Sequence, residues 1–326
     1  AMGYYDDRDI PYYWNIADQF VLFDRFFSSV GGGSLSNHTY WVTGSPGNFE
    51  SPERVPEGGW GDLPTIFDRL DQAGVSWKFY VQNYDPTINF RNPGEGHRRS
   101  QTIWVPLLNY ARYLDDPALS SHIVDLEQYF VDLEHGTLPS VAYIVPSGAS
   151  EHPPGSLEAG QRFVRNLLTS LMKSDYWWKS AFLWSYDDWG GWYDHVSPPR
   201  VDAYGYGFRV PALLVSPYAR KGYIDNTQMD FTSLLKFIQV NWNLAPLADR
   251  DAQAQTFMDA FDFSEDPRPP VLVSAVREAP SAPGSYRALV HLTYGAAILA
   301  AVGFLASRSP ARLGRRRPRA PRDESR

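Results

Sequence analysis

The chain of 326 residues is 43% hydrophobic and 15% aromatic, which provides for a large core and excludes a disordered protein. It contains no cysteine, which excludes a disulfide framework and a thiolate metal site. The formal charge is −7, but the last twenty residues carry eight Arg against Asp323 and Glu324, so the rest of the chain carries −13. Such an acidic body argues against nucleic acid as a partner.

The N-terminal region predicts a helix followed by a glycine loop. No signal peptide pattern precedes the helix, and apolar residues recur at helical spacing over residues 11–29. The glycines at 31–33 allow a backbone to approach a ligand closely, and Ser34 presents a hydroxyl that could act as a nucleophile. A helix beginning near Ser34 would add free N–H groups suited to an anion. The alternative is a flexible Gly-Ser loop without chemistry.

The middle of the chain alternates apolar strands with amphipathic helices. This order is typical of α/β proteins, and it predicts one domain with a mainly parallel central sheet flanked by helices. The predicted elements are a helix near 66–72, a strand at 75–81, a strand at 138–145, a helix at 157–173, a strand from 181, a strand at 211–216 and a helix from the capping residue Asp230 to about residue 243.

Acidic and histidine side chains follow two of the predicted strands. His152 comes after the strand at 138–145, and Asp187, Asp188 and His195 come after the strand that begins at residue 181. Because ligands bind outside the carboxyl ends of parallel strands, we expect both histidines at one edge of the sheet. The two carboxylates offer oxygen ligands for a divalent cation if the strand bends before them. The alternative is a solvated acidic turn.

Several ordered motifs resemble one family of enzymes, the phosphoesterases that include bacterial phospholipases C and a related acid phosphatase. This family belongs to the alkaline-phosphatase-like superfamily. The motifs cover the chain from about residue 3 to residue 263. They are residues 65–70 with 74–78, residues 151–154 (Glu-His-Pro-Pro), residues 186–188 with 194–199, residues 209–211 with 216–217, and residues 230–233.

The resemblance implies hydrolysis of a phosphate ester or phospholipid through a phosphoseryl intermediate. Ser34 falls where the family places its nucleophile, and Asn37 matches an Asn that follows it. His152 and His195 match active-site histidines. The metal ligands that the resemblance implies for a divalent cation are Ser34, Asp187 and Asp188.

The same resemblance also implies a strand that would lie upstream of this chain. In the family, that strand carries a Glu-Asn pair that completes the metal site, and we therefore expect the chain to lack the N-terminal segment. A missing central strand would leave the backbone edges of its neighbours exposed. A truncated or inactive relative that acts as a surface-tethered binding domain is thus the alternative to an active hydrolase.

The C-terminal part of the chain predicts a membrane anchor. Beyond a phosphoesterase domain at 1–263, a Pro-rich linker is expected at 264–286. Residues 289–306 contain no charge and are long enough to span a bilayer, which predicts a transmembrane helix at 287–308. The Arg-rich tail at 309–326 would stay cytoplasmic, and the acidic domain would face outward from the cell membrane.

Overall fold

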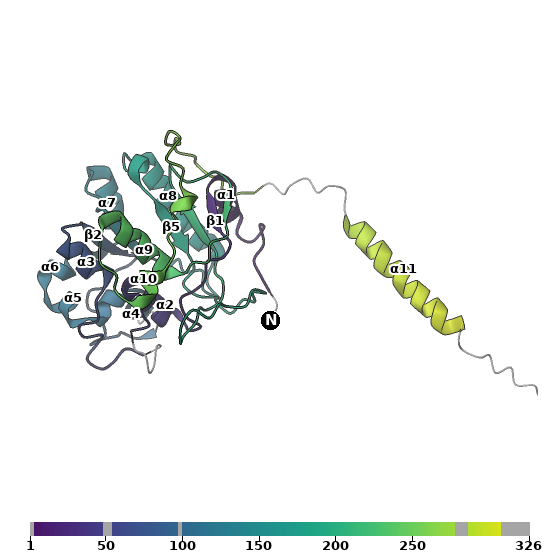
Figure 1. Cartoon of the computed structure of the whole chain (residues 1–326), viewed down its shortest axis with the longest axis horizontal. Helices are drawn as coiled ribbons and strands as arrows, with labels where there is room; N and C mark the ends of the chain where they lie inside the picture. Colours follow the sequence, from purple (N-terminus) through teal and green to yellow (C-terminus); the bar gives the residue numbers. More distant parts are fainter. Residues whose placement is uncertain (1–2, 48–53, 97–99, 278–285, 308–326) are drawn as a thin grey trace, which may run out of the picture. The chain divides into compact units, whose positions relative to one another are not determined.

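The computed structural model describes residues 3–47, 54–96, 100–277 and 286–307. The chain divides into two units, residues 1–277 and residues 278–326 (Figure 1). The first unit contains the strands and the hydrophobic clusters, and the second contains the helix α11 (Tyr286–Ser307). The predicted boundaries of linker and tail stay predictions: residues 264–277 of the expected linker lie in the first unit, and residues 278–285 and 308–326 lie outside the described residues.

One sheet of the first unit has three parallel strands. Its order is β3 (Ile123–Asp125), β2 (Trp77–Val81) and β4 (Val141–Val145). Strand β2 pairs with β3 from Phe79 and with β4 from Trp77, and both pairs are parallel. Four of the five side chains of β2 are buried, as expected for a central parallel strand.

The other sheet has four strands and mixed directions. Its order is β5 (Phe182–Ser185), β6 (Ala212–Val215), β1 (Val21–Phe23) and β7 (Tyr223–Asp225). Strand β6 is antiparallel to both β5 and β1, whereas β1 and β7 are parallel. The α/β class is confirmed, but the single, mainly parallel sheet is observed as one parallel and one mixed sheet among the described residues.

The predicted helix at 11–29 is wrong beyond its first half. Helix α1 (Pro11–Gln19) ends before Phe20, and β1 begins at Val21. Val21 pairs with Leu214 in β6, and both side chains are completely buried. A short apolar run fits helix and strand equally well by spacing, so the non-local pairing with β6 decides the structure.

The two helices that follow clear capping signals begin and end where the sequence predicts. Helix α8 (Leu157–Lys173) begins after Ser156, whose hydroxyl accepts a hydrogen bond from the Ala159 N–H. Helix α9 (Phe231–Trp242) begins after Asp230, whose carboxylate accepts from the Thr232 N–H, and ends at Asn243 in the left-handed region.

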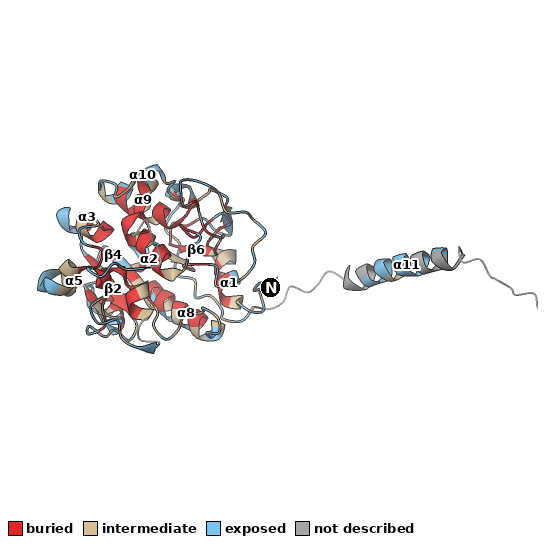
Figure 2. Cartoon of the chain, turned by 90° about the horizontal axis from the view of Figure 1, so that it is seen from below, coloured by how far each residue is buried: buried red, intermediate tan, exposed pale blue. Residues whose placement is uncertain are grey.

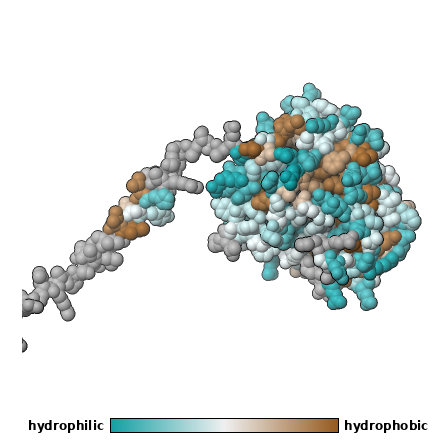
Figure 3. Space-filling model, turned by 180° about the vertical axis from the view of Figure 1, so that it is seen from behind, coloured by the Kyte–Doolittle hydropathy of each residue, from teal (hydrophilic) through white to brown (hydrophobic). Residues whose placement is uncertain are grey.

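The remaining helices cover the sheets and place the site loops. Figure 2 shows buried residues on both the strands and the facing sides of the helices, and Figure 3 shows hydrophobic side chains gathered on part of one outer face. The helices are α2 (Ser34–Thr43), α3 (Ile66–Gln72), α4 (Gln101–Trp104), α5 (Ala111–Asp115), α6 (Pro117–Ser120), α7 (Glu127–His135) and α10 (Asp249–Gln253), with 3-10 turns at Pro106–Asn109, Trp177–Lys179 and Met258–Ala260.

The predicted transmembrane helix is present as the helix α11, but its membrane role has no support from the structure. In the part of the chain that is described, no helix has the length and apolar content needed to cross a bilayer.

Candidate active site

Ser34 is the first residue of helix α2. Gly33 precedes it in an extended conformation, and the Ser34 side chain is half-buried. The N-terminus of a helix carries a partial positive charge and unpaired N–H groups, so a phosphoryl group near Ser34 would meet a favourable field. The sequence left open whether a helix begins near Ser34, and α2 begins there.

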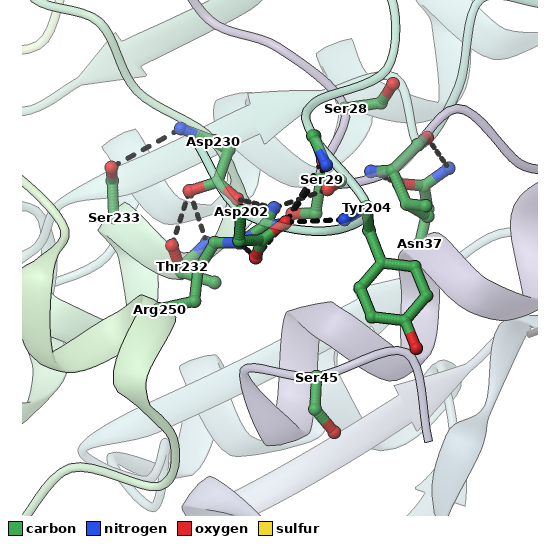
Figure 4. A network of polar contacts seen from close by, with 12 residues as sticks. Ser28, Ser29, Asn37, Ser45, Asp202, Tyr204, Asp230, Thr232, Ser233 and Arg250 are labelled. Carbon is green, nitrogen blue, oxygen red and sulfur yellow. Dashed lines mark hydrogen bonds and ion pairs between the residues drawn. The ribbon is translucent and has the colours of Figure 1, made fainter. Parts of the chain in front are cut away.

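Asn37 holds the loop that carries Ser34. Its side chain is completely buried; Oδ1 accepts from the Val30 N–H at 3.2 Å, and Nδ2 donates to the carbonyls of Gly32 at 3.3 Å and Gly33 at 3.1 Å. With both ends of its amide engaged by backbone, Asn37 fixes the position of the loop (Figure 4).

The acidic pair lies in the loop after β5, next to Ser34. Strand β5 ends at Ser185, and the Gly190 N–H donates to Asp188 Oδ1 at 2.8 Å, which closes a turn with Gly190 at a φ of +57°. The Ser34 hydroxyl donates to Asp188 Oδ2 at 3.3 Å, and Ser34 also acts on the pKa of Asp187. The bend that the sequence requires is thus present, and the acidic pair lies beside Ser34.

His38 belongs to the same cluster, although it is not among the site residues that the resemblance implies. Its Nε2 lies 3.4 Å from Asp187 Oδ2, and its ring packs edge-on against Trp41 at 5.4 Å between centroids. The side chain is only 10% exposed, and its Nδ1 is buried without a hydrogen-bond partner. His38 follows Ser34 by four residues on α2, so a helical spacing of i and i+4 could have placed both on one face.

The two carboxylates have opposite pKa shifts. Burial alone would raise the pKa of Asp187, but the hydrogen bond and charge of His38, with the bond from Ser34, lower it to about 2. Burial and the negative charge of Asp187 raise the pKa of Asp188. The cluster therefore combines a stable carboxylate with one that accepts a proton more readily.

The two predicted catalytic histidines are placed differently. His152 lines the same cavity as Asp187 and Asp188, and its charge acts on the pKa of Asp188. His195 is not among the residues that line this cavity; its side chain is 78% exposed and its Nδ1 lies 3.8 Å from Asp194. Asp194 in turn is held by Arg209 at 2.8 Å. The structure therefore brings His152, and not His195, to the acidic pair.

Glu151 is half-buried between two tyrosines beside the site. The hydroxyls of Tyr13 and Tyr186 donate to its carboxylate at 2.8 Å and 2.5 Å. Helix α8 packs so closely that a Cβ on Gly160 would lie 2.1 Å from the Cγ of Glu151. Burial raises the pKa of Glu151 to about 7, even though both tyrosine hydrogen bonds act to lower it.

The carboxyl group of Glu151 should make the free energy of unfolding depend on pH. Between pH 4.5 and 7 the folded chain keeps the Glu151 proton while the unfolded chain releases it, so stability should fall as pH rises, by up to about 3 kcal/mol. Glu151→Gln keeps a neutral group and should remove this slope, as measured by urea unfolding at pH 5 and pH 7.5. Glu158→Gln, at an exposed glutamate in the first turn of α8, is the control; an unchanged slope in Glu151→Gln would contradict the assignment.

A buried arginine, Arg250, holds the glycine loop in place together with Asn37 (Figure 4). Arg250 donates to the carbonyl of Ser29 at 2.5 Å and to Asp202, and it lies 3.5 Å from the buried Asp230. The loop before Ser34 is therefore anchored through Arg250 to the residue that caps α9.

The cluster fits part of a cation site. Asp187, Asp188 and Ser34 supply oxygen atoms, the donors that hard divalent cations prefer. Within the described residues, no group of three or more His, Cys, Asp or Glu side chains is arranged to hold a metal ion. The residues present thus agree with the chemistry of such an ion and supply a partial set of its ligands.

Comparisons with known proteins identify the family of the chain. The model of the Phosphoesterase family matches residues 1–245. The chain is 30% identical over 294 residues to the non-hemolytic phospholipase C of Burkholderia pseudomallei, which covers 74% of this chain and 41% of that protein. It is also 30% identical over 309 residues to phospholipase C A of Mycobacterium tuberculosis, with 82% and 58% covered. The chain therefore spans about half the length of the curated relatives it matches.

Among solved structures, the crystal structure of Ps i-CgsB matches with a TM-score of 0.51 and 15% identity, over 79% of this chain and 72% of that one. At this identity the match shows a shared α/β fold and does not extend to function.

Proposed function

Because the chain belongs to the phosphoesterase family, we propose that it catalyses the hydrolysis of phosphoric esters with Ser34 as nucleophile. One observation supports this most directly: the Ser34 hydroxyl lies at a helix N-terminus and donates a hydrogen bond to Asp188 of the acidic pair. A hydroxyl in this position has an acceptor for its proton and a positive field for the phosphoryl oxygens.

The residues suggest a two-step reaction. In the first step the Ser34 oxygen attacks phosphorus, its proton passes to Asp188, and the ester bond to the leaving alcohol breaks, while His152, which lines the same cavity, would protonate that alcohol. In the second step water gives a proton to His152 and attacks phosphorus, the bond between phosphorus and the Ser34 oxygen breaks, Asp188 returns its proton to that oxygen, and phosphate or a phosphomonoester is released. A divalent cation bound by Asp187 and Asp188 would polarise the phosphoryl oxygens. His38 would keep Asp187 ionised and oriented.

An inactive, tethered binding domain is the second candidate. The partial ligand set in the described residues favours it, because a weakly held cation would stabilise little developing charge. Both candidates predict binding of phosphate esters near Ser34, but only the first predicts turnover.

The test is turnover of 4-nitrophenyl phosphate and bis(4-nitrophenyl) phosphate, with and without EDTA. We expect release of nitrophenol that EDTA suppresses, and a loss of at least tenfold in apparent metal affinity for Asp188→Asn. Asp266→Asn, which removes an exposed carboxylate away from the cavity, is the matched control. Turnover insensitive to EDTA would refute the metal role, and the absence of turnover with added Mg²⁺, Mn²⁺ and Zn²⁺ would favour the binding domain.

Phospholipid is the substrate class we favour, because the curated relatives that match are named phospholipases C. The cell-membrane location with a cytoplasmic tail stays a prediction, supported only by the uncharged run at 289–306 and the arginines that follow it. Protease treatment of intact cells should digest the acidic domain and spare a tag placed after Arg326; digestion of the tag would overturn this orientation.

A further inference from the structure

Aromatic side chains gather beside the candidate site, where two segments of the chain meet. The first segment is residues 3–5, and the second is the loop 189–202 that follows the acidic pair. The rings of Tyr5 and Trp192 lie 4.6 Å apart between centroids, and a Cβ on Gly3 would lie 2.6 Å from the Trp192 ring. We call the five aromatic residues of this surface the aromatic rim: Tyr4, Tyr5, Trp189, Trp192 and Tyr193.

Three side chains of the aromatic rim are exposed to solvent. Tyr4 is 76% exposed, Tyr193 50% and Trp189 43%. The Trp189 ring packs against Phe208 at 4.9 Å between centroids, and the Trp192 N–H donates to the Trp189 carbonyl at 2.9 Å, so the loop holds the rings in place. A contiguous surface of large rings is unfavourable in water, and it therefore indicates a site for a partner.

The aromatic rim is continuous with the cavity that contains the acidic pair. Tyr5, Trp189 and Trp192 line this cavity, whereas Tyr4 and Tyr193 are not among its lining residues. A partner that contacted Tyr4 and Tyr193 would therefore lie next to the cavity in which we place the reaction. A protein docked there would cover the approach to the cavity, but a lipid layer could supply it with substrate.

The charges of the loop are compatible with a layer of phosphate groups. Asp194 accepts a hydrogen bond from Arg209 at 2.8 Å. Asp202 accepts one from Arg250 at 2.7 Å. These two residues are the carboxylates of the loop, so each is compensated by a cation. Arg200 is exposed, and a guanidinium group donates well to phosphate oxygens.

We propose that the aromatic rim docks the protein on a zwitterionic phospholipid layer, with Tyr4, Trp189 and Tyr193 in the interfacial region and Arg200 at the phosphates. Tyrosine and tryptophan are enriched at membrane–water interfaces, because the ring buries apolar area while its O–H or N–H stays in the polar layer. A zwitterionic layer suits this chain, because an anionic one would repel the acidic body. The choice of phospholipid rests on the proposed function.

A fluorophore at one residue of the aromatic rim tests the docking without turnover. Because the chain contains no cysteine, Tyr193→Cys can be labelled with nitrobenzoxadiazole at that position alone. The matched control is Trp178→Cys with the same label, since Trp178 is 45% exposed and precedes β5, whereas the loop 189–202 follows β5. With phosphatidylcholine vesicles, we expect the fluorescence at position 193 to rise about twofold or more and to be quenched by a nitroxide lipid, and that at position 178 to stay unchanged.

The difference between the two labels decides the proposal. Any binding of vesicles through residues 289–306 would occur in both variants, so binding as such is not the measure. Equal responses of the two labels, or no response at position 193, would overturn the proposal. A response that required phosphatidylglycerol would show attraction to anionic lipid instead. A response that grew with protein concentration in the absence of vesicles would show that a second copy covers the aromatic rim. Either result would also overturn the proposal.

A pair of serine variants connects docking with turnover. Tyr193→Ser should lower the hydrolysis of phosphatidylcholine in vesicles about fivefold or more, while that of bis(4-nitrophenyl) phosphate stays within about twofold. Trp178→Ser should leave both rates within about twofold. An equal loss on both substrates in Tyr193→Ser, with the fold kept by circular dichroism, would place Tyr193 in the reaction and overturn its docking role. If the unaltered chain hydrolysed neither substrate, the proposed function would fail, and the two labels would still decide the docking.

Discussion

Replacing Ser34 with alanine is expected to lower phosphoester hydrolysis by roughly 10³- to 10⁶-fold, which is the range for removal of a nucleophile that acts within a cluster. The fold should be kept, because Ser34 is half-buried and its hydroxyl hydrogen-bonds Asp188 in the cavity rather than a residue of the hydrophobic core. Initial rates on 4-nitrophenyl phosphate and its diester give the loss, and circular dichroism gives the fold.

A second measurement distinguishes a nucleophilic Ser34 from a hydroxyl that only lies near the reacting phosphorus. Rapid acid quench of the unaltered chain during turnover should leave phosphate on Ser34, detected by mass spectrometry of the peptide. Ser34→Thr retains a hydroxyl and should recover part of the activity that alanine loses. Wild-type rates in Ser34→Ala, or phosphate on another residue, would show that the attacking group lies elsewhere.

Replacing Arg250 with methionine is expected to destabilise the fold by about 3–5 kcal/mol, the cost of leaving a buried charge without its partner. The Arg250 side chain is 7% exposed and the Asp230 side chain is fully buried, with its Oδ2 lacking any hydrogen bond. Burial raises the pKa of Asp230, and Arg250 acts against that rise. Without Arg250, either the carboxylate stays uncompensated or the group takes up a proton.

Urea unfolding at pH 7 measures this loss. Arg220→Met serves as the matched control, because Arg220 is exposed and donates to the Asp259 carbonyl at 2.8 Å; it should cost less than about 1 kcal/mol. A loss for Arg250→Met no larger than that of the control would mean that the network in Figure 4 contributes little to stability. Lower pH should reduce the loss, since protonation of Asp230 removes the uncompensated charge.

Much of the fold could be read from local signals. The bounds of α8 and α9 follow from Ser156, Asp230 and Asn243, because capping hydrogen bonds and the left-handed turn act within a few residues. The strand at 21–23 could not be predicted, because three residues are too few to show a strand periodicity. Strand β1 forms through its pairing with β6 and β7.

The candidate site likewise contains residues that local sequence signals predict and residues that only long-range contacts identify. Ser34 and the acidic pair were predicted from a glycine loop and a strand end, and the structure brings Ser34 within hydrogen-bonding distance of Asp188. His38 was given no role, because that role depends on the contact with Asp187, a residue about 150 positions away in the chain. His195 was grouped with His152 by position after a strand, but its loop turns the side chain to solvent.

The sequence by itself determined the α/β class, the family, the capped helices and the chemistry available at Ser34, Asp187 and Asp188, because each depends on residues close together in the chain. Only the tertiary structure decided which strands pair, how Arg250 joins Asp230 to the glycine loop, and that β4 and β5 line one cavity. The physical reason is that pairing, burial and pKa shifts arise between segments far apart in sequence, where local spacing carries no information about contact.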